Sequence, residues 1–222
     1  TNPYTISGLT TGITYYAAIR ADYGNGQYSE WTSNLSFTPR NTTELTLFDG
    51  EKENNYAPIN GAKISSIAQT QIIIPSTEIT SIQGRQIVKL TFYAKEASVS
   101  WGVADFEVYL KETTTSSFPT SGAVLESWGT NVYNKGSLSV LDNKMEIELN
   151  TPFNYSSGNL LIGIKQITAG TNNTVTWLGS STFTGGIGLN VSGNTVTRIS
   201  YSRKVKITTT PITTAPEKID NN

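Results

Sequence analysis

The sequence has neither cysteine nor histidine. These two absences exclude several classes of chemistry, and they are more informative about function than any motif that is present. Without cysteine there is no disulfide, thiol nucleophile, iron–sulfur cluster or cysteine-ligated zinc site. Without histidine there is no Ser–His–Asp triad, no histidine metal site and no imidazole base near neutral pH. The remaining options are carboxylate chemistry, a Ser–Lys or tyrosine mechanism, an oxygen-ligand metal site, or no catalysis, and the last is favoured.

Charge and long apolar runs are also scarce. Charged residues make up 15% of the 222 residues and the formal net charge is −1, so no global field favours nucleic acid or an anionic membrane. The longest apolar runs, such as NLLIGI, are too short to span a bilayer, and we expect no membrane insertion. The sequence lacks a signal peptide and does not begin with Met, which we interpret as a processed or excised fragment.

Thr, Ser, Asn and Gly are abundant instead, which favours short strands and turns over helices. Residues 41–210 contain many short alternating segments separated by Gly, Asn, Ser or Pro. In DFEVYLKE, for example, alternation places Phe106, Val108 and Leu110 on one face. The pattern predicts an all-β fold, an antiparallel β-sandwich of the jelly-roll type, over residues 41–210. Residues 211–222 are predicted to be a linker or tail, because they contain Pro and Thr and little to bury.

Residues 1–40 have a different pattern. Alternation around Tyr15 and Ile19, the turn YGNGQ and the segment SEWTSNLSFT resemble the last three strands of a fibronectin type III domain. The matching residues are Leu9, Gly12, Tyr15, Ile19, Ala21, Ser29, Trp31, Ser33 and Phe37. The resemblance implies an incomplete sandwich, because a full domain needs roughly 90–100 residues. It also implies that the Tyr15 hydroxyl forms a hydrogen bond with nearby backbone. One hydrophobic face of residues 1–40 is therefore expected to lack the strands that would pack against it in a complete domain.

The stretch ELNTPFNYSSGNLLIGIKQ, residues 148–166, raises the question of a glycine-containing ligand loop. No lysine follows the glycine and no helix is predicted after it, so the stretch does not match a phosphate-binding loop. We expect Pro152 to end one strand, because it cannot donate to a ladder, and SSGN to form the turn into the next. We therefore interpret the stretch as a structural connection between two strands and not as a ligand-binding loop.

The same stretch carries a second resemblance. The element from Leu149 to Gly163, the strand and Ser/Thr-rich loop from Val108 to Phe118, and the segment Asn55 to Pro58 resemble a jelly-roll module of secreted Bacteroidetes surface proteins. The resemblance covers roughly residues 45–165. Such modules resemble the adhesin regions attached to secreted proteases and often follow fibronectin type III domains. The resemblance implies an extracellular or cell-surface accessory module that binds glycan or a surface protein within a longer polypeptide, but it transfers no functional residues.

Glycan binding on a sandwich uses exposed aromatic rings with amides or carboxylates nearby. Trp128 and Tyr133, in the turn-rich LESWGTNVYNKG, are the first candidates, and Trp177 in NNTVTWLGSS is the next. For each of them the competing interpretation is an inward-facing core aromatic. A binding module should expose at least two aromatic rings on one face or rim.

No cofactor is expected, and calcium is the one metal that the composition suggests. The segment FDGEKENN would supply Asp49 and Glu51 as ligands, with a structural role under the adjacent strand. The segment lacks the spacing of an EF-hand loop, and a solvated acidic loop is the favoured interpretation.

The leading functional hypothesis is a non-catalytic extracellular module for adhesion or binding, most simply of glycan or protein ligands. One alternative is a structural spacer that buries nearly all of its aromatic rings. The other is a glycoside hydrolase, which would need two facing carboxylates, such as Glu107 with Glu146 or Glu148. The absence of a groove with paired acids would exclude this third hypothesis.

Overall fold

The computed structural model describes residues 6, 8–39, 41–181 and 188–212, and it is all-β and antiparallel, as predicted. The chain divides into two compact units, Thr1–Thr42 and Thr43–Asn222. Of the expected tail 211–222, only residues 211 and 212 are described, and Pro211 is the last residue of strand β19 (Val205–Pro211). No helix in the described part of the chain has the length and apolarity needed to cross a membrane.

The N-terminal unit contains two small sheets, β1 (Tyr15–Ala17) with β4 (Leu35–Phe37) and β2 (Asp22–Gly24) with β3 (Gln27–Tyr28). The Tyr15 hydroxyl accepts a hydrogen bond from the Thr10 N–H at 3.0 Å, which is the backbone contact implied by the resemblance. The Tyr15 ring stacks on Phe37 with 6.0 Å between ring centroids. These contacts join the two strands of the first sheet.

Large apolar side chains of this unit are mostly exposed. Tyr16, Ile19 and Leu35 have 72%, 73% and 69% of their surface accessible. Packing is confined to small clusters: the Arg20 guanidinium lies 3.8 Å from the Tyr28 ring centroid and 4.7 Å from that of Trp31. Cation–π contacts at exposed sites contribute about 0.5–1 kcal/mol each, so they do not replace a buried core.

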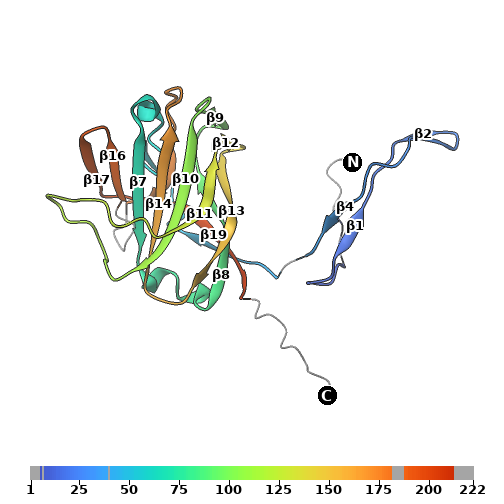
Figure 1. Ribbon diagram of the computed structural model, residues 1–222, viewed down its shortest axis with the longest axis horizontal. Coiled ribbons are helices and arrows are strands. Elements are labelled where there is room, and N and C mark those ends of the chain that lie inside the picture. Colours follow the sequence, from blue (N-terminus) through green and yellow to red (C-terminus); the bar gives the residue numbers. More distant parts are fainter. Residues whose placement is uncertain (1–5, 7, 40, 182–187, 213–222) are drawn as a thin grey trace, which may run out of the picture. The chain divides into compact units, whose positions relative to one another are not determined.

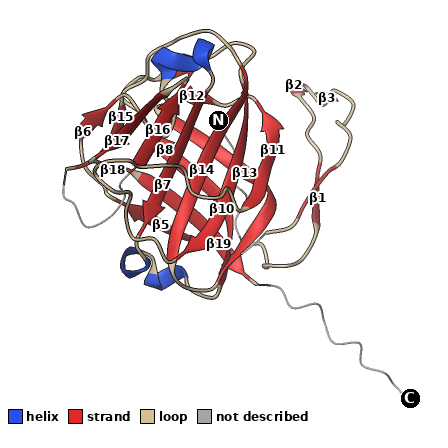
Figure 2. Cartoon of the chain, turned by 60° about the vertical axis from the view of Figure 1, so that its left-hand side comes forward, coloured by secondary structure: helices blue, strands red, loops and turns tan. Residues whose placement is uncertain are grey.

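The second unit is a sandwich of two six-stranded sheets with a small third sheet (Figures 1 and 2). The first sheet has the order β11 (Thr130–Gly136), β10 (Asp105–Thr113), β14 (Asn159–Thr168), β7 (Ala68–Ile74), β16 (Gly188–Ser192) and β17 (Thr195–Ile199). The second has the order β5 (Thr43–Leu47), β19, β8 (Arg85–Tyr93), β13 (Lys144–Tyr155), β12 (Ser139–Leu141) and β9 (Ser98–Ser100). The small sheet pairs β15 (Trp177–Ser180) with β18 (Ser202–Arg203) and β6 (Lys52–Asn54).

Three short 3-10 helices lie at the ends of the sandwich. Figure 2 shows η1 (Gly61–Ser66) at one end and η2 (Ser76–Glu78) with η3 (Thr80–Ile82) at the other. The long strands alternate between the sheets along the chain: β7, β10 and β14 lie in the first, and β8, β13 and β19 in the second. This alternation is the connection pattern of a jelly roll.

The core lies between the two large sheets. Along β10, Phe106, Val108 and Leu110 are buried, as their alternation predicted. On the facing sheet, Met145 and Ile147 of β13 are buried as well. Because successive residues of a strand point to opposite faces, the intervening polar residues lie on the outer faces of the sandwich.

The outer face of the first sheet is also covered. Residues 114–129, which connect β10 to β11 and are called the strap below, run across this face (Figures 1 and 2). The strap and the sheet share a second small core, made of Ile73, Phe118, Leu161 and Leu189 with Ala123, Leu125 and Val191 packed against it. Burial on both faces explains the continuous apolar run NLLIGI of β14.

The stretch 148–166 connects two strands of the sandwich, as interpreted from the sequence, but its first strand does not end at Pro152. Strand β13 continues to Tyr155, with a register shift against β8 between Glu148 and Phe153, so the proline lies at an irregularity where it need not donate to the ladder. The turn that follows is capped from β10, because the Glu112 carboxylate accepts hydrogen bonds from the backbone N–H groups of residues 156 and 157 at 2.6 and 3.1 Å.

Candidate functional site

Trp128 lies at the end of the strap, on the outer face of the first sheet. It is half-buried and covers Gly163 of β14, where an added Cβ would come within 2.8 Å of its ring atoms. The Tyr109 ring lies beside it, 5.4 Å away between centroids. One face of the indole is therefore used in packing against the strand.

This packing leads to a testable prediction for Gly163→Ala. The new methyl group would collide with the Trp128 ring, and we expect the free energy of unfolding to fall by about 1–3 kcal/mol, which urea denaturation would measure. In the Trp128→Ala background, the same change should cost almost nothing, because the obstructing ring is gone. An equal cost in both backgrounds would contradict the packing described.

The other two predicted aromatics do not join Trp128. Tyr133 of β11 packs against the main core between the sheets, and its hydroxyl donates a hydrogen bond to the Ser137 carbonyl at 3.1 Å. Trp177 is 0% exposed, and its indole N–H donates to the Ile59 carbonyl at 2.8 Å. The surface role expected for Trp177 is thus not possible in this structure, because both of its ring faces are enclosed by the core.

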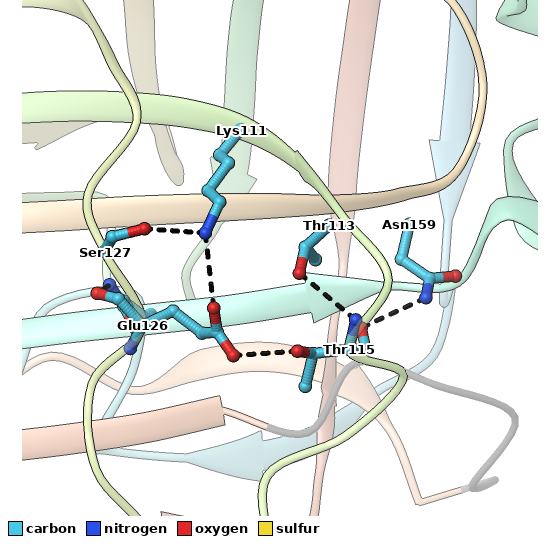
Figure 3. Close-up of polar contacts among 7 residues, drawn as sticks. Lys111, Thr113, Thr115, Glu126, Ser127 and Asn159 are labelled. Atoms are coloured by element: carbon cyan, nitrogen blue, oxygen red, sulfur yellow. Dashed lines mark hydrogen bonds and ion pairs between the residues drawn. The ribbon is translucent and has the colours of Figure 1, made fainter.

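A polar network fastens the strap near Trp128 (Figure 3). The Glu126 carboxylate accepts a hydrogen bond from the Thr115 hydroxyl at 2.7 Å and pairs with the Lys111 ammonium at 3.3 Å. The Thr115 hydroxyl, and then Lys111, lower the pKa of the Glu126 carboxyl, while partial burial opposes them. Gln71 of β7 is buried beneath and exchanges two hydrogen bonds with the backbone of residue 126, at 2.7 and 2.9 Å. The members of the network bond mainly to one another, so the network explains the path of the strap.

The acidic loop predicted as a calcium site is paired with lysine. The Lys204 ammonium lies 2.5 Å from an oxygen of Asp49 and 3.9 Å from one of Glu51. It supplies the positive charge that a cation would otherwise bring. Within the residues that the structure describes, no three acidic side chains come together as a metal site.

The facing carboxylates of the hydrolase hypothesis lie on opposite sides of the molecule. Glu107 alternates with buried residues of β10 and lies on the outer face of the first sheet, where Tyr109 donates to it at 2.5 Å. Glu146 and Glu148 lie on the outer face of the second sheet, each 3.0 Å from the Lys89 ammonium. These carboxylates cannot act on one glycosidic bond, because the core separates them.

A different site is formed where the first sheet extends beside η1. It is a hollow of about 300 Å³, called the Tyr56 groove below, lined by Tyr56, Asn60, Lys63, Ser66, Asn190, Ser192, Gly193, Thr195 and Thr197. Leu189 and Val191 of β16 pack under the strap, so strand alternation turns Asn190 toward the groove. Asn190 is 2% exposed and donates to the Thr70 hydroxyl at 3.1 Å. This amide and the neighbouring hydroxyls of β16 and β17 form a polar floor.

The wall opposite β16 comes from the chain before and within η1. Asn60 stands at the N-cap of η1, yet its side chain makes no capping hydrogen bond. It is 6% exposed and lines the groove, and no hydrogen-bond partner of its amide is found in the described residues. The Asn60 amide atoms are not among the described buried atoms that lack a hydrogen-bond partner, so solvent or a ligand can reach them from the groove. The Asn60 side chain is therefore available to a ligand in the groove.

Tyr56 forms the exposed rim. Its surface is 46% accessible, and its backbone N–H is held by the Asn54 side-chain oxygen at 2.8 Å. A second, shallower hollow of about 350 Å³ is lined by Glu53, Asn54, Asn55 and Tyr56. One exposed aromatic residue thus lines two polar hollows.

Sequence reasoning overlooked this site because its parts lie far apart in the chain. Thr70 and Asn190 are 120 residues apart and meet only through the pairing of β7 with β16. The local signal is an aromatic residue among asparagines, NNYAPIN, in a segment that also carries part of the family resemblance. The chain matches no protein-family model, no curated protein and no solved structure, so its function is inferred from geometry.

Proposed function

We propose that the chain is a non-catalytic, extracellular accessory module that binds glycans in the Tyr56 groove. The observation that carries the proposal is the exposed Tyr56 residue on a hollow that Asn60 also lines, with no partner of the Asn60 amide among the described residues. Sugars have one apolar face for a ring and several hydroxyl groups for amides, and this pairing of groups matches both. The resemblance of residues 45–165 to modules of secreted surface proteins supports the extracellular assignment.

The charges around the groove favour binding over hydrolysis. Of the described residues, Glu53 is the one carboxylate that lines either hollow, and its oxygen lies 2.7 Å from the Lys95 ammonium. Glycoside hydrolysis ordinarily needs two carboxyl groups on either side of the bond that breaks. A ligand in these hollows would meet amides, hydroxyls and one aromatic ring.

Binding to a glycan array, followed by calorimetry with the best oligosaccharide, tests the proposal. We expect Tyr56→Ala to weaken binding about 10-fold or more, because the stacking surface is lost, while Tyr56→Phe keeps most of the affinity. Stability should change by less than about 0.5 kcal/mol, since the side chain is exposed. Tyr23→Ala, at an exposed tyrosine of the N-terminal unit, is the matched control and should bind normally.

Two outcomes would reject the proposal. A folded protein that binds no glycan would favour the spacer hypothesis. Binding that Trp128→Ala abolishes and Tyr56→Ala leaves unchanged would move the site to the outer face of the first sheet.

A further inference from the structure

We infer that the Tyr56 groove selects sugars that carry an anionic group, a carboxylate or a sulfate, and that Lys63 is the residue that selects them. The inference rests on the proposed function and adds the class of ligand. Among the nine described residues that line the main hollow, Lys63 is the one with a charged side chain. A ligand that fills this hollow therefore meets a net positive site.

The Lys63 ammonium is free to bind a ligand. Its side chain is exposed, and no carboxylate lies within ion-pair distance in the part of the chain that the structure describes. In contrast, the Lys95 and Lys204 ammonium groups pair with the carboxylates of Glu53 and Asp49, at 2.7 and 2.5 Å. The pairing of Lys95 with Glu53 also neutralises the one acidic group beside the groove, so it does not repel an anion.

The backbone under Lys63 is held firmly, which keeps the ammonium at the groove. The Lys63 N–H donates to the Asn60 carbonyl at 3.0 Å, and the adjacent carbonyl of Ile64 accepts from the buried Gln166 side chain at 2.6 Å. The Ser65 N–H donates to the Asn172 side chain at 2.8 Å. A fixed attachment point reduces the entropy lost when the side chain engages an anion.

The charge acts beside neutral groups that recognise hydroxyls. Asn60 and Asn190 lie in the same hollow and can bond the sugar ring substituents, while the ammonium bonds the anionic group. Neutral sugars would still bind through the ring and the amides, with lower affinity. Selection between acidic and neutral sugars is thus separable from sugar binding itself.

The test compares three probes of equal length by calorimetry at low salt: a galacturonic acid oligomer, its carboxyl-reduced neutral form and a sulfated galactose oligomer. We expect the wild-type chain to bind at least one acidic probe about 5- to 10-fold more tightly than the neutral probe. Lys63→Gln should remove this preference, because it weakens the acidic probes more than the neutral one. Added salt should reduce the preference of the wild-type chain, because it screens an exposed charge.

The matched control is Lys144→Gln, on a strand of the second sheet away from the groove, which should keep the preference. Preference for the carboxylate or for the sulfate probe alone would support the inference and identify the anion. Equal binding of acidic and neutral probes, unaffected by Lys63→Gln, would overturn the inference and leave the proposed function standing. Absence of binding by all three probes and by the wider glycan array would overturn both.

Discussion

Replacing Trp177 with alanine is expected to lower the free energy of unfolding by about 3–5 kcal/mol, because the change opens a large cavity in the core. The side chain is 0% exposed and lies against Trp101, with 6.5 Å between ring centroids. Its indole N–H satisfies the carbonyl of Ile59, which would lose that partner. Denaturant unfolding followed by circular dichroism would measure the loss as a lower midpoint.

Two further variants show whether the loss arises from burial. Trp177→Phe keeps most of the packing and removes the N–H donor, so we expect an intermediate loss of about 1–3 kcal/mol. Trp128→Ala removes a tryptophan that is half-buried on the outer face and should cost less than Trp177→Ala. If the two tryptophan-to-alanine variants lost equal stability, the core position of Trp177 would be contradicted.

The second large effect is expected at Gln166, a buried amide near one end of β14 that binds three backbone groups. Its side chain accepts a hydrogen bond from the Ala68 N–H at 2.9 Å and donates to the carbonyls of Ile64 and Thr168 at 2.6 and 2.9 Å. Gln166→Leu has a similar volume but leaves these groups without a partner. At about 1–3 kcal/mol for each unpaired buried group, we expect a total loss of 3 kcal/mol or more.

The matched control for Gln166→Leu is Lys165→Gln, at the preceding residue, whose side chain lies on the opposite face of the strand. It should change stability by less than about 0.5 kcal/mol. Hydrogen exchange would locate the damage, since the amide of residue 68 should lose its protection in the leucine variant. Unchanged protection there would show that the side chain is not the partner of that backbone group.

The fold could be predicted from the sequence where a pattern is local. The alternation of Phe106, Val108 and Leu110 reports which side of a strand is buried, and the structure confirms it. Pro152 was misinterpreted because a proline within a strand depends on the neighbouring strand: the register shift between β13 and β8 accommodates it, and no local signal announces that shift. The strap was not predicted either, since its small core combines residues from four separate segments.

The candidate site was less predictable than the fold. Aromatic residues in polar segments were predicted to bind a ligand. Trp177 and Tyr56 have similar neighbours in the sequence, so this criterion does not separate them. The two differ because β15 pairs with β6 and places Trp177 beneath the loop that carries Tyr56. The burial of Trp177 and the exposure of Tyr56 depend on tertiary structure, because they result from the pairing of strands that are far apart in the chain. The same holds for Asn190, which alternation alone could assign to either face.

The hydrogen bonds that hold the strap on the sheet affect how the strap sequence can vary among relatives of this protein. Gln71, Asn159 and Arg198 hold the strap through its main chain, by bonds to the backbone of residue 126, to the Thr115 carbonyl at 3.0 Å and to the Phe118 carbonyl at 2.9 Å. Three of these bonds are to backbone carbonyls, which every amino acid offers, and one uses the N–H of residue 126, which every amino acid but proline offers, so the sheet specifies much of the route. Relatives should therefore vary in strap sequence outside its small apolar core while they keep these anchors, and a strap of equal length with similar core residues should graft onto this sheet.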